Sequence, residues 1–173
     1  KIVCLSYGER GESQFAWKAA GAKMADVKAQ RKDEAQRAAD LLGAEIEFFD
    51  AGDYPLRSTP EMLERLIDIN HELKPSFILT HSLQDPYNVD HPEAARLAQE
   101  ARIIAQAAGH KPDPARAYSA PPVFLFEPHQ PEQGDFKPNL IVNIDEVWET
   151  KRQAFEILSA QKHLWEYYTR VAL

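Results

Sequence analysis

The side chains best suited to chemistry lie in residues 85–92, which read DPYNVDHP. An apolar run at 77–80 precedes this stretch, and a helical pattern begins near Pro92. We therefore expect a loop between a buried strand and a helix. In open α/β sheets, loops at the carboxyl ends of strands are where ligands bind. Two aspartates, an asparagine and a histidine in such a loop, with His81 just upstream, favour a functional site.

Asp90 and His91 are the central candidates in this loop. Asp90 followed three residues later by Glu93 matches a capping box, which places His91 in the first turn of the helix. An aspartate that caps the helix would also fix the direction of the His91 ring, and metal-binding imidazoles are usually held in this way. Two plainer interpretations stay open: Asp90 as a helix cap alone, and His91 as a solvated surface side chain.

Other polar loops also follow expected strands. Gly8 and Gly11 permit a tight turn at the start of the chain, and the acidic residues there are not a phosphate loop because the Lys-Ser/Thr ending is missing. This loop is either part of a site or a plain turn, and the same alternatives hold for Glu127 and His129. In a parallel sheet, loops at strand ends share one edge, which predicts an acidic crevice. It would be formed by residues 7–13, 50–54, 81–91 and 127–133.

Apolar runs and helical periodicity alternate along the chain, which predicts an α/β fold. We expect a Rossmann-like, mainly parallel sheet with helices on both faces. The aromatic tail at 163–168 is expected to pack on the domain or on another subunit, and Asp145 is expected to cap the last helix. The expected strands are 2–5, 45–49, 77–80, 123–126 and 140–144; the expected helices are 24–42, 60–73, 92–108 and one long helix from Glu146 onward, with a loop at 111–122.

Composition limits the partners of the chain. Its 173 residues carry a formal net charge of −7, which argues against a nucleic-acid or anionic-membrane partner. No apolar run approaches the roughly 20 residues of a membrane span. The one cysteine, Cys4, excludes an internal disulfide and a thiolate metal cage, and suits a reducing cytoplasm. We expect one cytoplasmic domain over residues 1–173. Because the sequence opens inside a strand without an initiating Met, we expect it to be truncated at both ends.

Several motifs in order resemble the LmbE/PIG-L superfamily, which has the zinc-dependent de-N-acetylase fold. The resemblance implies a first strand before Lys1 and a zinc ion as cofactor. In that superfamily a His and an Asp of an N-terminal His-x-x-Asp segment bind zinc, together with the last His of a His-Pro-Asp-His motif, which is His91 here. The first two ligands are expected upstream of Lys1. Residues 1–173 alone are therefore predicted to bind zinc weakly or not at all. The motifs are GERGE at 8–12, Arg31 with Glu34 ahead of Leu42 and Gly43, and Asp90 with His91.

Asn88 departs from this pattern, because it replaces the first His of the His-Pro-Asp-His motif. In deacetylases that His helps to stabilise the oxyanion and the leaving amine, whereas Asn can donate a hydrogen bond but cannot transfer a proton near pH 7. Longer stretches resemble instead a hydratase branch of the superfamily, which acts in bacterial gallate and protocatechuate degradation. These enzymes add water to a carbon–carbon double bond. The stretches are residues 4–13, 81–88, 126–133 and 163–170.

The resemblance to these hydratases implies a zinc-dependent lyase acting on a small tricarboxylate, as a dienol or its keto form. We expect a homo-oligomer in which His91 binds the metal. His81 is expected to lie next to His91 without binding the metal itself. A substrate with several carboxylates needs cationic partners, although Arg31 also suits an internal ion pair with Glu34 or Asp53. The implied catalytic residues are Glu9, Asn88, Asp90 and His129, and the implied substrate-binding residues are Arg10, Arg31 and Glu127.

Two other functions stay open. One is a zinc hydrolase that removes an acetyl group from an N-acetyl sugar, the usual reaction of the superfamily. The other is a non-catalytic scaffold that kept the fold and lost the metal. Acetate release identifies the hydrolase, and zinc content separates the scaffold from both enzymes.

Overall fold

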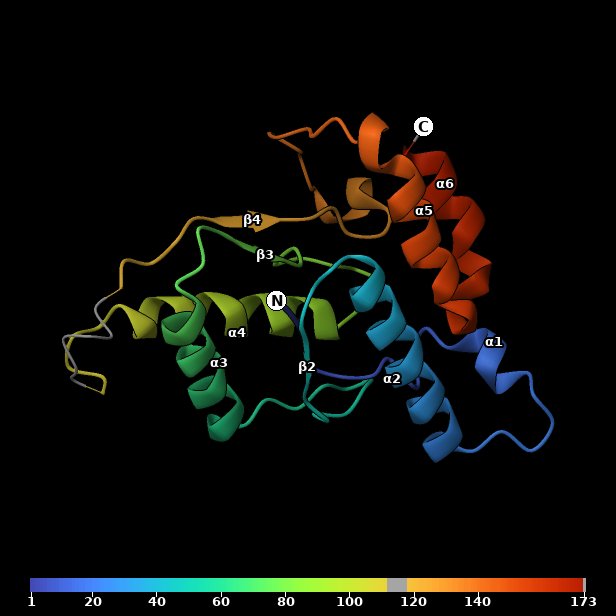
Figure 1. Ribbon diagram of the computed structural model, residues 1–173, viewed down its shortest axis with the longest axis horizontal. Helices are drawn as coiled ribbons and strands as arrows, with labels where there is room; N and C mark the ends of the chain where they lie inside the picture. The colour runs from blue at the N-terminus through green and yellow to red at the C-terminus, as the bar shows by residue number, and fades with distance from the viewer. Residues whose placement is uncertain (112–117, 173) are drawn as a thin grey trace. The chain divides into compact units, whose positions relative to one another are not determined.

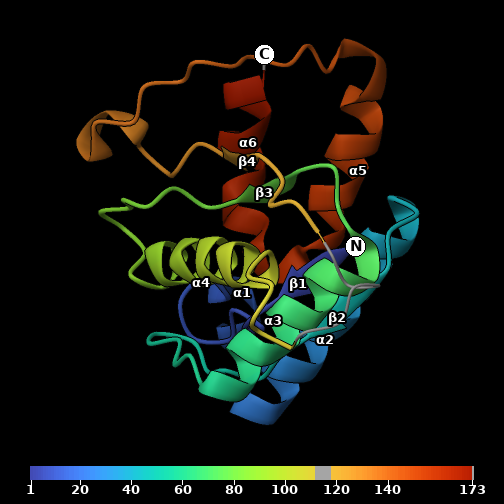
Figure 2. The same cartoon turned by 90° about the vertical axis from the view of Figure 1, so that its left-hand side faces the viewer.

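The structure is a computed structural model that describes residues 1–111 and 118–172, so half of the expected loop at 111–122 lies outside the described residues. The chain divides into two compact units. The first unit is Lys1–Tyr54 together with Ile141–Leu173, and the second unit is Pro55–Leu140. Each unit has its own pair of parallel strands, whose four members are labelled across Figures 1 and 2. The single domain expected over residues 1–173 stays a prediction.

In the first unit, β1 (Ile2–Cys4) pairs in parallel with β2 (Ile46–Phe48). Two helices lie between these strands in the sequence, α1 (Gln14–Trp17) and α2 (Met24–Leu41). The bounds of α2 agree with the expected helix at 24–42. The chain leaves this helix through Gly43, whose φ of +63° is a conformation that glycine adopts without a steric cost.

The C-terminal part of the first unit differs from the single long helix expected from Glu146. It consists of η3 (Asp145–Val147), α5 (Trp148–Ile157), η4 (Ser159–Leu164) and α6 (Trp165–Ala172). The break falls at Leu158, whose ψ of 66° lies outside the helical region. Asp145 does not cap α5, because its carboxylate accepts a hydrogen bond from the Asn143 side chain instead. The aromatic tail packs on α5, with the ring centroids of Phe155 and Tyr168 6.2 Å apart.

The strand expected at residues 140–144 does not form. Among the residues that the structure describes, these have no strand partner, and Ile141 is 88% exposed. An apolar run becomes a strand only where a neighbouring strand satisfies its backbone groups and covers its side chains. The run of Leu140, Ile141 and Val142 shows a tendency to form a strand, but it does not show whether a neighbouring strand is present. The prediction was wrong for this reason.

In the second unit, β3 (Ile78–Thr80) pairs in parallel with β4 (Val123–Leu125), with Leu79 opposite Phe124. Helix α3 (Pro60–Leu73) precedes β3, and α4 (Asp90–Ala105) lies between the two strands in the sequence. A short 3-10 helix, η2 (Pro131–Gly134), follows β4. Thr59 caps α3, which begins where the sequence predicted, since its hydroxyl accepts a hydrogen bond from the backbone N–H of Met62.

The core of the second unit lies between α3 and α4, which pack against each other (Figures 1 and 2). Fully burying one aliphatic side chain such as Ile67 or Leu97 contributes about 1.5–3 kcal/mol. The packed faces of the two helices therefore hold the loops at their ends in place. The buried apolar residues of these helices are Met62, Leu66, Ile67, Ile69, Ala95, Leu97, Ala101 and Ala105.

Both strand pairs in the described part of the chain are parallel, and helices separate the strands in the sequence. The expected α/β class with parallel strands is confirmed. Within residues 1–111 and 118–172, none of the helices has the length and apolar character that crossing a membrane requires.

Candidate functional site

His91 and Asp85 form the centre of the loop between β3 and α4. Nδ1 of His91 lies 2.7 Å from Oδ2 of Asp85, whose side chain is only 1% exposed. Oδ1 of Asp85 accepts hydrogen bonds from the backbone N–H groups of Tyr87 and Asn88, at 2.9 and 3.0 Å. Because an ionised carboxylate only accepts hydrogen bonds, Nδ1 of His91 carries the hydrogen in this contact. The loop thus orients the imidazole and leaves its side chain 27% exposed.

His81 lies against the ring of His91. The two imidazoles are stacked, with centroids 3.9 Å apart and planes 13° apart. Phe126, directly after β4, contacts His81 edge-on with a centroid distance of 4.5 Å. Burial, helped by the neighbouring His91, lowers the pKa of His81 to about 4. His81 is therefore neutral at pH 7 and serves as a packing surface for His91.

The capping box expected at Asp90 does not form. Helix α4 begins at Asp90 itself, after Val89, and Oδ1 of Asp90 accepts the backbone N–H of Leu56 at 2.9 Å. Glu93 accepts a hydrogen bond from the Ser58 hydroxyl instead of turning back to the helix end. The prediction was wrong because backbone and side chains ahead of α3 bind both carboxylates. The orientation of the neighbouring imidazole by Asp90 stays a prediction.

Asn88 stabilises the turn ahead of α4. Its Oδ1 accepts the backbone N–H of Asp90 at 2.9 Å, and the residue is buried. This contact fixes the side-chain amide of Asn88 beside the turn that carries His91. The role of Asn88 in catalysis stays a prediction.

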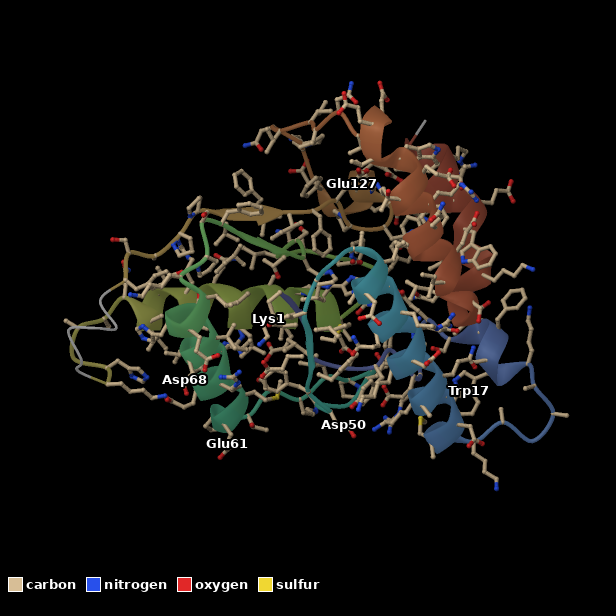
Figure 3. The ribbon with its side chains drawn as sticks, viewed as in Figure 1. Lys1, Trp17, Asp50, Glu61, Asp68 and Glu127 are labelled. Atoms are coloured by element: carbon tan, nitrogen blue, oxygen red, sulfur yellow. The ribbon has the colours of Figure 1, made fainter. Side chains whose placement is uncertain are left out.

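The loop after β4 contacts the loop that carries His91. The hydroxyl of Tyr87 donates to Oε1 of Gln133 at 2.7 Å, and the Tyr87 ring meets the His129 ring edge-on with centroids 5.9 Å apart. Glu127, labelled in Figure 3, follows β4 and is exposed. Loops 81–91 and 127–133 thus lie together, as expected from their places after two paired strands. His129 is next to this contact, whereas the chemical roles of His129 and Glu127 stay predictions.

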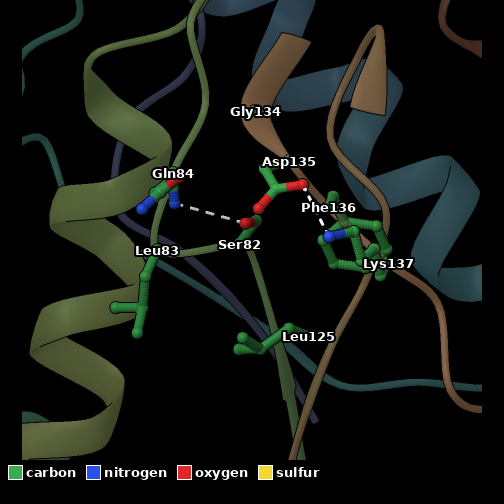
Figure 4. Close-up of a pocket in the computed structure, with 8 residues that line it drawn as sticks. All are labelled: Ser82, Leu83, Gln84, Leu125, Gly134, Asp135, Phe136 and Lys137. Carbon is green, nitrogen blue, oxygen red and sulfur yellow. Dashed lines mark hydrogen bonds and ion pairs between the residues drawn. The ribbon is translucent and has the colours of Figure 1, made fainter. Parts of the chain in front are cut away.

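A pocket of about 270 Å³ lies beside these two loops (Figure 4). One wall is polar, since the Ser82 hydroxyl accepts the backbone N–H of Gln84 and Asp135 pairs with Lys137 at 3.0 Å. None of the site residues predicted from the sequence lines this pocket. Its lining residues are Ser82, Leu83, Gln84, Leu125, Gly134, Asp135, Phe136 and Lys137.

The first unit carries Glu9, the buried carboxylate of the glycine-flanked loop after β1. Its side chain is 2% exposed, and Oε1 lies 3.5 Å from Nζ of Lys28. Among the described residues, Oε2 of Glu9 has no hydrogen-bond partner. Lys28 also contacts Asp50 at 2.6 Å, so one cation serves two carboxylates. A buried carboxylate with one unpartnered oxygen is a candidate for acid–base chemistry.

The two arginines of the first unit differ in their surroundings. Arg10 is exposed, and its backbone N–H donates to Oδ2 of Asp53 at 2.5 Å. The Nε of Arg31 donates to the carbonyl of Tyr7 at 3.0 Å, and Nη1 lies 3.6 Å from Oε2 of Glu34. Of the two internal partners that the sequence offered to Arg31, the structure therefore has Glu34. Substrate binding by either arginine stays a prediction.

Sequence reasoning missed the roles of Asp85 and Lys28. The turn at Asp85 has a local signature, because an aspartate ahead of a proline commonly accepts hydrogen bonds from the next backbone N–H groups. Its contact with His91 has no such signature. Lys28 lies one helical turn before Arg31 on α2, and this spacing places both cations on one helix face. That spacing could have identified Lys28.

The expected zinc ion can be tested against the side chains that would hold it. His91 fits the role of one ligand, since a carboxylate on Nδ1 leaves Nε2 as the metal-binding nitrogen. Among residues 1–111 and 118–172, no group of three His, Cys, Asp or Glu side chains is arranged to hold a metal ion. The described residues thus contain one fitting ligand and not the three protein ligands of a typical catalytic zinc site.

Comparisons with known proteins identify the family of the chain. The family model for GlcNAc-PI de-N-acetylase (PIG-L) matches residues 1–102. The chain is 54% identical to 4-oxalmesaconate hydratase from Pseudomonas putida KT2440 over 172 residues, which are 99% of this chain and 66% of that protein. The chain therefore spans just under two thirds of the length of this curated relative.

Solved structures resemble the chain closely. GalB, the 4-carboxy-2-hydroxymuconate hydratase from P. putida KT2440, has a TM-score of 0.95 at 54% identity, covering 99% of this chain and 71% of that chain. N,N′-diacetylchitobiose deacetylase from Pyrococcus horikoshii has a TM-score of 0.75 at 23% identity, with coverages of 98% and 63%. At this identity, the similarity to the deacetylase shows a shared fold alone. The family model matches more than half of the chain, and the chain belongs to the GlcNAc-PI de-N-acetylase (PIG-L) family.

Proposed function

We propose that the protein is a hydratase that adds water to the double bond of 4-oxalomesaconate, also called 4-carboxy-2-hydroxymuconate. The observation that carries the proposal is the 54% identity to the P. putida hydratase along 99% of the chain. The aligned region includes the loop of Glu9 and the loop of His91. The reaction would serve the degradation of aromatic acids.

Hydration delivers a proton to one carbon of the double bond and a hydroxyl group to the other. We assign the proton transfers to Glu9 and His129. Glu9 is supported by its burial and by an oxygen without a partner among the described residues. His129 is supported by its place next to the loop that carries His91.

Binding a tricarboxylate requires cationic groups, because each carboxylate must exchange its water for a charged hydrogen-bond donor. We assign this role to Arg10 and Arg31, with Glu127 lining the site. The Glu34 carboxylate and the Tyr7 carbonyl hold the Arg31 guanidinium, so its orientation is set before substrate binds.

We propose zinc as the cofactor, with His91 as one of its ligands. When bound, zinc would polarise the 2-oxo or enol oxygen of the substrate or lower the pKa of a bound water. Asp85 and His81 hold the His91 ring, and Asp90 and Asn88 hold the turn beneath it. We further propose that the protein works in the cytoplasm as a homo-oligomer. Light scattering of the purified protein tests the oligomeric state.

The test is a hydration assay on the full-length gene product, following the loss of the ultraviolet absorbance of the conjugated dienol. We expect turnover that is lost on chelation and restored by Zn²⁺. The variant His91→Ala should lose both zinc and activity, whereas the matched control His110→Ala should keep both. A folded, zinc-loaded protein that does not consume the dienol would overturn the proposal.

The second candidate is the removal of an acetyl group from an N-acetyl sugar. The family model that matches the chain is named for this reaction, which favours it. Asn88 counts against it, because an amide cannot take over the proton transfer of the histidine found there in deacetylases. Acetate release without hydration would establish this activity in place of the hydratase. A folded protein without zinc and without either activity would instead be a scaffold.

A further inference from the structure

Asp53, in the loop after β2, binds the loop that carries Glu9. Its Oδ2 accepts hydrogen bonds from the backbone N–H groups of Arg10 and Gly11, at 2.5 and 2.8 Å. Asp53 is buried, so its carboxylate is largely shielded from water. One carboxylate oxygen therefore fixes the two amides that directly follow Glu9.

The backbone next to Asp53 contains one strained residue, Tyr54. Gly52 and Tyr54, on either side of Asp53, have φ values of 81° and 43° in the left-handed region. This conformation is uncommon for a bulky side chain such as Tyr, and it persists only where the surroundings impose it. The Tyr54 ring packs on Gly11, where an added Cβ would lie 2.3 Å from Cε2 of Tyr54. Asp53 and Tyr54 therefore both contact the loop that carries Glu9.

Two more contacts hold the backbone carbonyls of Glu9 and of Gly8 directly before it. The indole N–H of Trp17 donates to the carbonyl of Glu9 at 2.7 Å, and the Ser13 hydroxyl donates to the carbonyl of Gly8 at 2.6 Å. The Glu9 side chain, in contrast, has Lys28 at 3.5 Å and an Oε2 without a partner in the described part of the chain. A buried carboxylate oxygen without a hydrogen bond is costly, which a functional role would explain.

We propose that Asp53 is a positioning residue that holds Glu9 in place for proton transfer. This inference rests on the proposed hydratase function. Asp53 acts through the backbone N–H groups of Arg10 and Gly11 rather than by touching the substrate. Losing its carboxylate would release the loop while leaving β1 paired with β2. Because the loop carries both Glu9 and Arg10, kcat should fall and KM should rise.

The experiment compares Asp53→Ala, Asp53→Asn and the control Asp40→Ala in the full-length zinc-loaded protein. Asp40 is an exposed aspartate on α2 outside the site. Because a misplaced catalytic group commonly costs about 100-fold in rate, we expect that loss of kcat for Asp53→Ala, together with a rise of KM from the displaced Arg10. Asp53→Asn keeps an acceptor oxygen and should lose only about tenfold. Asp40→Ala should match the parent protein.

Amide hydrogen exchange separates positioning from general destabilisation. The Arg10 and Gly11 amides should exchange at least about tenfold faster in Asp53→Ala, because their shared acceptor is gone, while exchange in α3 stays unchanged. A lower thermal midpoint with an unaltered kcat in the folded variant would overturn the proposal. If Asp53→Ala does not fold, an unaltered kcat in Asp53→Asn would overturn it. If the parent protein lacks hydratase activity, the proposed function fails first, and unchanged exchange at Arg10 and Gly11 would then also reject the role of Asp53.

Discussion

The carboxylate of Asp85 joins the His91 ring to the turn that precedes α4, through a 2.7 Å contact with Nδ1 and two hydrogen bonds from backbone N–H groups. The orientation of the imidazole and the shape of the loop therefore depend on the same side chain. A carboxylate in this position fixes the tautomer and the ring orientation of a metal-binding histidine. Asp85 thereby performs the task that the sequence analysis gave to Asp90.

Asp85→Asn tests this role with little change of shape. The amide oxygen can still accept the backbone N–H groups, but the contact with His91 loses its charge. We expect the zinc affinity of the full-length protein to fall by about 10–100-fold. The free energy of unfolding should fall by only about 1 kcal/mol. Calorimetric zinc titration and urea unfolding measure the two effects, and an unchanged zinc affinity would show that Asp85 serves the turn alone.

His81 should act through its ring and not through its charge. Because its pKa is lowered to about 4, it is neutral at pH 7, and a phenyl ring can replace it against His91 and Phe126. We expect His81→Phe to lower the free energy of unfolding by less than about 1.5 kcal/mol. His81→Ala should cost about 2–4 kcal/mol by leaving a cavity. Urea unfolding of both variants decides, and equal losses would contradict a packing role.

Where a structural element depends on local signals, the sequence predicted it closely. The expected helices at 24–42 and 60–73 agree with α2 and α3, because the cap at Thr59 and the left-handed backbone at Gly43 are properties of a few neighbouring residues. The run at 140–144 failed because a strand needs a partner from elsewhere in the chain. The break at Leu158 carries no proline or glycine, so no local signal announced it.

The candidate site was predictable in its residue types and not in its contacts. Polar residues after strand ends pointed to Glu9 and His91, since ligands bind at this edge of α/β sheets. The carboxylate of Asp90, however, binds a backbone N–H 34 positions away, and that of Asp53 binds one 43 positions away. Long-range partners of this kind compete with local caps, and a single sequence does not show which one wins.

Cys4 offers a test of the interior of the first unit by pH. Burial raises the pKa of its thiol, and the opposing effect of Arg31 is smaller. The thiolate is the reactive form, so iodoacetamide should modify Cys4 more slowly in the folded protein than in urea at pH 8. The folded state holds the thiol proton of Cys4 more tightly than the unfolded state does. The contribution of Cys4 to stability is therefore fully present below the pKa of the thiol in the unfolded chain, and it is lost as the pH rises through the higher pKa of the folded protein. Mass spectrometry follows the modification, and equal rates in both states would contradict the shift.

Glu34 should be a strong determinant of stability in the first unit. Its side chain is 1% exposed, and Oε1 accepts hydrogen bonds from the Ser159 hydroxyl and the Ala160 N–H, at 2.6 and 3.1 Å. These bonds tie α2 to η4, and Oε2 faces Arg31. Removing one member of a buried ion pair leaves the other uncompensated, so Glu34→Ala should cost about 3–5 kcal/mol.

Glu34→Gln separates the two functions of this carboxylate. The amide keeps an acceptor for η4 and loses the charge opposite Arg31, so the loss of stability should be only about 1–2 kcal/mol. The matched control is Asp33→Ala on the exposed side of the same helix, where a solvated ion pair contributes less than about 1 kcal/mol. Urea unfolding gives all three values. If Glu34→Ala were no worse than Asp33→Ala, the bonds to η4 would be dispensable, and the fixed orientation of Arg31 would lose its structural basis.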